Sequence, residues 1–220
     1  MKNRKAVYYI ILMFLPLVLV LIALPFLPEQ IPAHYGADGT VTRWGSKFET
    51  LIFPVVTIIF GAVMLVVAQA AGKNEEDGKN NEKVTVIAGL ASLAVFDVMT
   101  CFFLYTDFNQ VEDLGDVPFG NSQILFTVFG AGMIVLGNVM PKLRMNSVAG
   151  LRTKWSMKNE TVWKKCQRFG GISFIVGGIC MIIACFLAED DACLAVSLGI
   201  LCVLIVVDVW YTYLAAKEDR

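Results

Sequence analysis

Six long apolar stretches, joined by shorter polar segments, set the pattern of this 220-residue chain. A helix needs about 20 apolar residues to cross the hydrocarbon layer of a membrane, and each stretch reaches about that length. The pattern therefore predicts an all-α integral membrane protein with six transmembrane helices. The predicted spans are residues 6–27, 50–71, 84–106, 121–140, 170–188 and 193–214.

The basic residues predict how these spans are oriented. None of the 18 Lys and Arg residues falls inside a predicted span, which fits the cost of placing a bare cation in lipid. Sixteen lie in the two termini and in the second and fourth connectors, whereas Arg43 and Lys47 lie in the first connector. Because cytoplasmic loops carry the excess of Lys and Arg, we expect an N-in/C-in, multi-pass protein of the cell membrane.

The composition excludes several other classes of protein. Apolar residues make up 57% of the chain and charged residues 17%, against about 25% charged in ordinary globular proteins. Too few charges remain to cover a soluble domain, so a soluble enzyme, a secreted disulfide domain and a disordered tail are all excluded. We expect no cofactor, and no nucleophile–base pair indicates an enzyme.

The cysteines and glycines carry weaker signals. The six cysteines show no CxxC pair and no histidines at zinc spacing, so we expect no metal site. Cys185 and Cys193 flank one outer turn, where a bridge between them is sterically open but not required. Some glycines predict faces where helices approach closely. They are Gly130, Gly137, Gly170, Gly177 and Gly178.

The first connector, residues 28–47, has the pattern of a small β-hairpin. Pro32 favours extended geometry in the residue before it, and Gly36 and Gly39 supply the conformational freedom of a tight reversal. We expect residues 31–35 to pair with residues 40–44 at the outer membrane interface, with Tyr35 and Trp44 at headgroup level. The candidate residues for binding an extracellular ligand are Pro32, His34, Tyr35, Asp38 and Trp44.

Three roles are open to His34, the only histidine of the chain. It is a pH-sensitive or metal-binding group with Asp38 or Glu29, or it holds the hairpin by bonding the loop backbone, or it contacts an extracellular ligand. The outer connectors also carry ten acidic residues against two basic ones. Such a face attracts a cationic peptide or a metal ion, although topology alone also empties outer loops of cations.

The fourth connector, residues 141–169, is long and basic. Beyond a cap at Ser156 or Asn159, apolar positions fall on one side of a helix and cations on the other. We expect this amphipathic helix to lie in the inner headgroup plane, where each cation contributes about 1 kcal/mol of attraction to anionic lipid. The candidates for binding lipid or a cytoplasmic regulator are Asn146, Arg152, Trp155, Trp163, Lys164, Lys165 and Arg168.

Two acidic residues lie inside predicted spans. Asp97 is near the middle of the third span and has no obvious cationic partner, so it is protonated and hydrogen-bonded between helices, hydrated in a cavity, or bound to a cation. Asp208 lies in the inner half of the sixth span, and we expect it to pair with a cation of the inner loop. Asp97 is the candidate for an ion or proton path, whereas a structural role is favoured for Asp208.

Two motifs on opposite sides of the membrane resemble known families. Residues 27–36, with Gly39 and Lys47, resemble the hallmark of the membrane domain of unknown function DUF1648. The signature of the SdpI family is similar to Asn146, residues 150–153 (Gly-Leu-Arg-Thr), Trp155-Ser156, Asn159-Glu160, Val162-Trp163 and Arg168-Phe169-Gly170-Gly171. Cys166-Gln167 stands where a polar pair such as Thr-His or Thr-Asn is usual. The resemblance divides the chain into a DUF1648-like region, 1–71, and an SdpI-like region, 72–220.

This resemblance implies a function in bacterial self-protection. The founding member of the family is an immunity protein that protects a Gram-positive cell from its own secreted killing peptide, and also holds a transcriptional autorepressor at the membrane. For this chain it implies a toxin peptide outside, a repressor and anionic lipid inside, and no direct contact with nucleic acid. A small proton- or ion-coupled transporter that uses Asp97 is the alternative.

Overall fold

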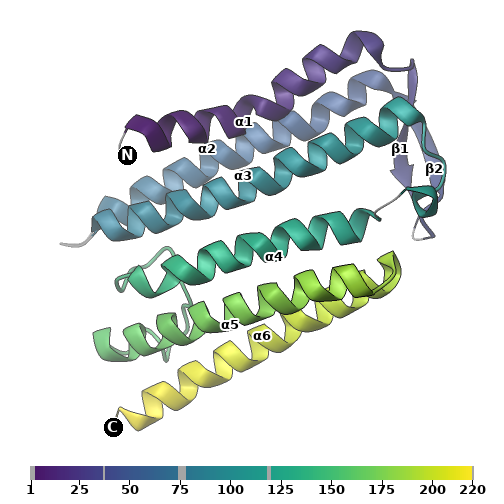
Figure 1. Cartoon of the computed structure of the whole chain (residues 1–220). Coiled ribbons are helices and arrows are strands. Elements are labelled where there is room, and N and C mark those ends of the chain that lie inside the picture. The colour runs from purple at the N-terminus through teal and green to yellow at the C-terminus, as the bar shows by residue number, and fades with distance from the viewer. Residues whose placement is uncertain (1–2, 37, 74–77, 118–119, 220) are drawn as a thin grey trace.

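The computed structural model describes residues 3–36, 38–73, 78–117 and 120–219. Its long helices are α1 (Asn3–Ala23), α2 (Ile52–Lys73), α3 (Gly78–Asn109), α4 (Asn121–Val139), α5 (Glu160–Leu187) and α6 (Asp190–Glu218). Short 3₁₀ turns are η1 (Leu24–Phe26), η2 (Lys47–Leu51), η3 (Leu114–Asp116) and η4 (Met140–Lys142). Strands β1 (Gln30–Tyr35) and β2 (Val41–Ser46) form one antiparallel hairpin between α1 and α2 (Figure 1).

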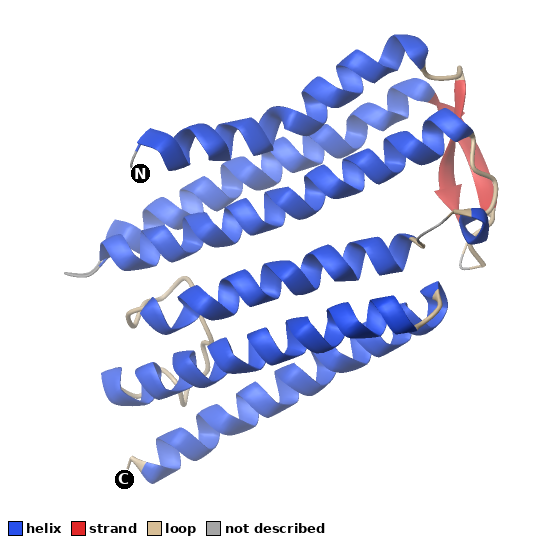
Figure 2. Ribbon diagram, viewed as in Figure 1, coloured by secondary structure: helices blue, strands red, loops and turns tan. Residues whose placement is uncertain are grey.

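The six helices run side by side, and all six are long and apolar enough to cross a membrane. Both chain ends lie at one end of the bundle and the hairpin lies at the other (Figures 1 and 2). We call these the termini end and the hairpin end. The fold class is therefore confirmed as an all-α, multi-pass membrane protein with a β-hairpin between its first two spans.

Helices α1, α2 and α3 pack as one group. The Tyr9 ring of α1 lies over Gly89 of α3, and its hydroxyl donates to the Gly61 carbonyl of α2 at 3.0 Å. Leu93 is fully buried in the same core. Since α3 shares this core, the regions 1–71 and 72–220 describe sequence motifs, whereas the packing places α3 with the first two helices.

Helices α4 and α5 touch backbone to backbone. A Cβ atom added at Gly130 would lie 2.8 Å from the Gly178 carbonyl oxygen, and one added at Gly178 would lie 2.5 Å from the Gly130 oxygen. The same reciprocal contact joins Gly137 and Gly171, one seven-residue step along each helix. The predicted close approach of these helices is confirmed, because only glycine leaves room for it.

The structure corrects the expectation of a separate helix in the headgroup plane. Helix α5 begins after Asn159, whose side chain accepts a hydrogen bond from the Val162 amide at 2.9 Å, and runs unbroken to Leu187. The Gly170-Gly171 pair does not break the helix. Both glycines lie against η4, where the Met140 methyl would lie 2.7 Å from a Cβ atom added at Gly170. The amphipathic stretch is therefore the first part of the fifth span.

Candidate functional site

A small cap of extended chain covers the hairpin end. Residues 110–114, which follow α3, run along β2: the Val41 amide donates to the Glu112 carbonyl at 2.9 Å, and the Leu114 amide donates to the Gly39 carbonyl at 3.0 Å. Gly39 has φ +81°, which favours glycine at the tip of the hairpin. We call β1, β2 and residues 110–114 the hairpin cap.

His34 and Asp38 both hold the geometry of the hairpin. Nδ1 of the exposed His34 lies 2.7 Å from the Thr42 hydroxyl on the opposite strand. The Asp38 carboxylate accepts hydrogen bonds from the Thr40 hydroxyl and amide, which hold the pKa of Asp38 below its usual value. Of the roles open to His34, the structure favours the one that braces the hairpin, although its partner is a side-chain hydroxyl. No group of three potential metal ligands occurs among the described residues.

The other three predicted residues of the hairpin differ in their exposure. Trp44 remains 38% exposed, whereas Pro32, opposite it in the register, is buried. The Tyr35 hydroxyl donates to the Val111 carbonyl at 2.9 Å. Burial, with a smaller effect from the neighbouring Asp107 carboxylate, raises the pKa of Tyr35. Pro32 and Tyr35 thus line a pocket, and His34, Asp38 and Trp44 are exposed.

A pocket of about 290 Å³ lies under the hairpin cap, between β1, β2 and the ends of α2 and α3. Its polar groups are few. The Arg43 guanidinium makes a two-pronged ion pair with Glu49, with N–O distances of 3.1 and 2.8 Å. Asp107 is only 4% exposed and accepts one hydrogen bond, from the Thr50 hydroxyl at 3.1 Å. The apolar walls include Ile31, Pro32, Ile52, Phe53, Val56 and Phe103.

Asp107 does not stand out in the sequence, where it is one of the ten acidic residues of the outer connectors. Its burial depends on Thr50 and Tyr35, which are more than 50 residues away in the chain. The one local signal is its position immediately after the third predicted span, where a helix still continues.

At the termini end, the segment before α5 is held by buried polar side chains. Asn146, 5% exposed, donates to the carbonyls of Arg144 and Ala149 and accepts from the amides of Val148 and Ala149. Such an arrangement satisfies all the bonding groups of one amide side chain within a single turn. Asn146 therefore shapes this segment from within and is not part of its surface.

Two further side chains tie the segment to α5. The fully buried Gln167 amide both donates to and accepts from the backbone of Leu151, each at 3.0 Å. The Trp163 indole, also fully buried, donates to the Leu143 carbonyl at 2.9 Å. Gln167 thus keeps a polar role in place of the usual family residue. The expectation that Trp163 binds a regulator or lipid directly is wrong for this conformation, because its side chain is enclosed.

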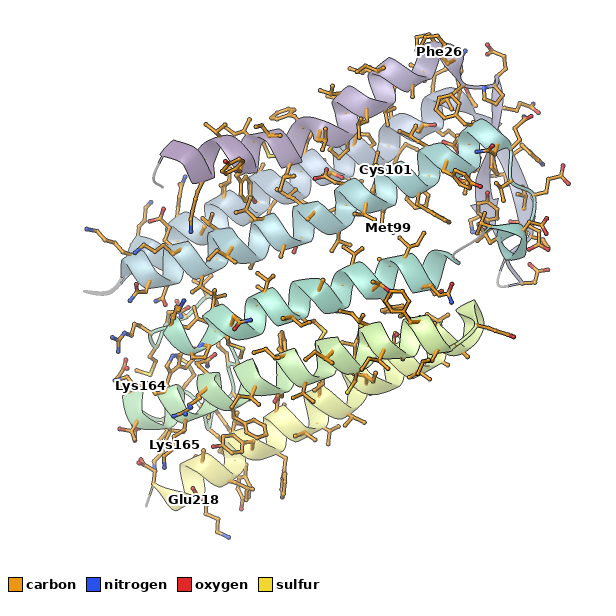
Figure 3. All side chains as sticks on the ribbon, in the orientation of Figure 1. Phe26, Met99, Cys101, Lys164, Lys165 and Glu218 are labelled. Atoms are coloured by element: carbon orange, nitrogen blue, oxygen red, sulfur yellow. The ribbon has the colours of Figure 1, made fainter. Side chains whose placement is uncertain are left out.

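We call residues 141–169 the basic segment. Its remaining candidate residues are available for contact. Lys164 and Lys165 project from the first turns of α5 (Figure 3). Arg152 and Arg168 are also exposed. Trp155 is half-buried, packs edge-to-face on Tyr213 with ring centroids 5.5 Å apart, and lies under the Lys154 ammonium. The termini end therefore presents a basic surface on a hydrogen-bonded scaffold.

The carboxyl end of α6 closes against this scaffold. Asp219 accepts a hydrogen bond from the Asn159 side-chain amide at 2.6 Å and lies 3.5 Å from the Lys158 ammonium. These contacts, the first of them foremost, lower the pKa of Asp219. The Lys158 ammonium also donates to the Ala216 carbonyl at 3.1 Å.

The two intramembrane acids differ in their partners. Neither carboxylate oxygen of the buried Asp97 has a hydrogen-bond partner among the residues that the structure describes. Asp208 accepts a hydrogen bond from the Ser173 hydroxyl of α5 at 2.7 Å. The expected pairing of Asp208 with an inner-loop cation is not formed among the described residues, because α5 presents this hydroxyl directly to it.

Two family models match separate stretches of the chain. The model of the SdpI/YfhL protein family matches residues 142–212, which hold most of the basic segment, α5 and most of α6. The model of the domain of unknown function DUF1648 matches residues 11–58, which hold most of α1, the hairpin and the start of α2. The chain is also 23% identical to the Immunity protein SdpI of Bacillus subtilis over 203 residues, 92% of each chain. Together these matches support membership of the SdpI family.

A second relative covers much less of the chain. An uncharacterized protein of Archaeoglobus fulgidus is 44% identical over 43 residues, which are 20% of this chain and 24% of that protein. No solved structure matches the chain. The region matched by DUF1648 includes the hairpin, and the region matched by the SdpI/YfhL family includes most of the basic segment.

Proposed function

We propose that this SdpI-family protein is a membrane immunity protein that protects the cell carrying it against a secreted, membrane-active killing peptide. The observation that carries the proposal is the similarity along 92% of the chain to a protein named Immunity protein SdpI. The proposed function needs no catalysis. It requires a surface that meets the peptide before or as the peptide enters the bilayer.

The hairpin cap is the proposed meeting point. In the orientation favoured by the basic residues, the hairpin end faces the outside and the basic segment faces the cytoplasm. Trp44 lies partly exposed on the cap, and His34 and Asp38 are exposed beside it. An aromatic ring at the interface with polar groups around it suits an amphipathic peptide.

The test is protection of a sensitive strain. Expression of the wild-type chain is expected to raise survival in the presence of the secreted peptides of a strain that carries this gene. Trp44→Ala is expected to lose most of that protection, whereas Trp210→Ala, which removes a 61% exposed tryptophan from the side of α6, is the matched control. Equal survival with and without the wild-type chain, at verified membrane expression, refutes the proposed function.

A signalling role at the other face belongs to the same proposal. The exposed cations Arg152, Lys164, Lys165 and Arg168 lie where a cytoplasmic repressor with an acidic surface is captured, next to anionic lipid headgroups. Arg168→Ala is expected to keep protection and to reduce copurification of the repressor, and Lys142→Ala is the control from the neighbouring exposed turn. If no cytoplasmic protein copurifies with the wild-type chain after peptide exposure, the signalling role is refuted.

One observation favours a second candidate function, coupling to an ion or proton. Asp97 is buried at mid-span, and no described residue forms a hydrogen bond with its carboxylate. Intramembrane carboxylates of this kind mark ion and proton paths in other membrane proteins. If Asp97 carries ions or protons, Asp97→Asn is expected to abolish ion-dependent flux in proteoliposomes, whereas Glu112→Gln is expected to leave this flux unchanged. Identical flux for Asp97→Asn and the wild type refutes it.

A further inference from the structure

The pocket under the hairpin cap carries one more negative charge than positive charge. Arg43 supplies its cation, but both guanidinium contacts go to Glu49 at the rim. Asp107, on the α3 side, is 4% exposed and takes no part in an ion pair among the described residues. Within the part of the chain that the structure describes, its hydrogen-bond partner is the neutral Thr50 hydroxyl. A buried carboxylate in this setting gains most from a cation that brings its own hydrogen-bond donors.

The size and lining of the pocket limit what that cation is. A volume of about 290 Å³ lies at the lower edge of small-molecule sites, so it suits one long side chain. Phe53 and Phe103, with ring centroids 5.1 Å apart, offer aromatic surface beside the carboxylate. Such rings attract a cation and cover an aliphatic stem. A divalent metal ion fits poorly, because it requires more oxygen ligands than one unpaired carboxylate provides.

We propose that this pocket binds a primary ammonium or guanidinium group on an aliphatic stem, the chemistry of a Lys or Arg side chain, with Asp107 as its counter-ion. This proposal rests on the proposed immunity function and names the group by which the peptide is recognised. That group is one basic side chain, which lies beneath the hairpin cap while the rest of the peptide lies at the interface. Asp107 is the specificity-determining residue, and Phe53 and Phe103 hold the stem.

The experiment uses hexylammonium as the probe and hexanol as its uncharged counterpart. The full-length chain, labelled with ¹³C at its aspartate carboxyl carbons and held in nanodiscs of neutral lipid, is titrated with each compound. We expect a saturable shift of the Asp107 resonance with hexylammonium, at least tenfold tighter than any response to hexanol. Comparable responses to both compounds in the wild type overturn the proposal without any mutant.

Two variants with the same change of charge test the residue. Asp107→Asn is expected to weaken hexylammonium binding at least tenfold, followed through the Thr50 methyl resonance. Asp116→Asn, at an exposed acid nine residues further along the chain and outside the hairpin cap, is expected to bind as the wild type does. Equal weakening in both variants shows diffuse surface charge and overturns the proposal, as does unchanged binding in Asp107→Asn.

The same variants separate this proposal from the proposed function. A wild-type chain that fails to protect cells but still prefers hexylammonium refutes the immunity function and supports the cation pocket. A chain that protects cells equally well with Asp107 and with Asn at that position overturns the pocket as the recognition site and supports immunity by another contact.

Discussion

The backbone contact between α4 and α5 gives a sharp prediction for Gly178→Ala. A Cβ atom there would lie 2.5 Å from the Gly130 carbonyl oxygen and 3.0 Å from the Ile134 side chain. Ordinary contacts begin near 3.4 Å, so the helices must separate by about 0.9 Å. Rotation of a side chain does not relieve the overlap between the Cβ atom and the carbonyl oxygen, because that oxygen belongs to the backbone of α4. Forced expansion of a packed interface of this kind costs about 1–3 kcal/mol.

Gly199→Ala on α6 is the matched control, because a Cβ there meets nothing within 4 Å. Both substitutions gain the same intrinsic helix propensity, about 1 kcal/mol, so the difference between the variants isolates the steric effect. We expect Gly178→Ala to be less stable than Gly199→Ala by about 2 kcal/mol, or roughly 4–8 °C in melting temperature for a chain of this size.

The assay is thermal unfolding in detergent, followed with a thiol-reactive fluorophore that reports exposure of the buried cysteines Cys166, Cys185 and Cys193. Far-UV circular dichroism at the starting temperature checks that each variant retains its helices. Equal melting temperatures for the two variants refute the argument that glycine is required at the α4–α5 contact.

Three further predictions concern other parts of the molecule. The Sγ atoms of Cys185 and Cys193 lie 2.6 Å apart at the corner between α5 and α6, so copper phenanthroline is expected to join them, detected by mass spectrometry as a linked peptide pair. Asn146→Ala removes four hydrogen bonds from a buried turn and is expected to destabilise the chain by about 2–3 kcal/mol in denaturant titration. Thr40→Ala removes the hydroxyl hydrogen bond, the larger of the two effects that lower the pKa of Asp38, and keeps the bond from the backbone amide of residue 40. An NMR titration is therefore expected to give a higher pKa for Asp38 in the variant. In the wild type, the contribution of this turn to stability is present above the usual carboxylate pKa and is lost as the pH falls through the lowered value.

The chain supplies controls for these predictions. Cys180 and Cys202 are exposed on α5 and α6, and an equal yield of their cross-link would contradict the proximity of the buried pair. Ser147→Ala, next to Asn146 but exposed, is expected to change stability by less than about 0.5 kcal/mol. For the third prediction, an unchanged pKa of Asp38 in Thr40→Ala would contradict the assigned cause.

The spans and the hairpin were predictable because their signals are local. About 20 consecutive apolar residues suffice to indicate a membrane helix, and the glycines between residues 36 and 39 suffice to indicate a reversal. The continuity of α5 was not predictable, since Gly170 and Gly171 indicate a break when read alone. In the structure, the η4 turn at Met140 packs against both glycines, and α5 continues without a break.

The candidate site was predictable only where function requires exposure. Arg152 and Lys165 were expected at the surface and lie there, whereas Trp163 was expected to bind a partner and is enclosed by its own chain. An ordered motif does not reveal whether its members form a surface or support one. Asp107 was not predicted for a related reason. It lies near Thr50 and Tyr35, and the spacing of these residues in the sequence does not indicate that they come together.

The central claim is that the hairpin end faces the outside of the cell and the basic segment faces the cytoplasm. The direct measurement places single cysteines at the exposed positions Asp116 and Lys154, one at each end of the bundle, in a chain whose native cysteines are replaced. Intact cells are then treated with a membrane-impermeant maleimide. The account predicts that the cysteine at position 116 is labelled at once, and that the cysteine at position 154 is labelled only after permeabilisation. Labelling of both positions in intact cells, or of position 154 alone, would contradict it.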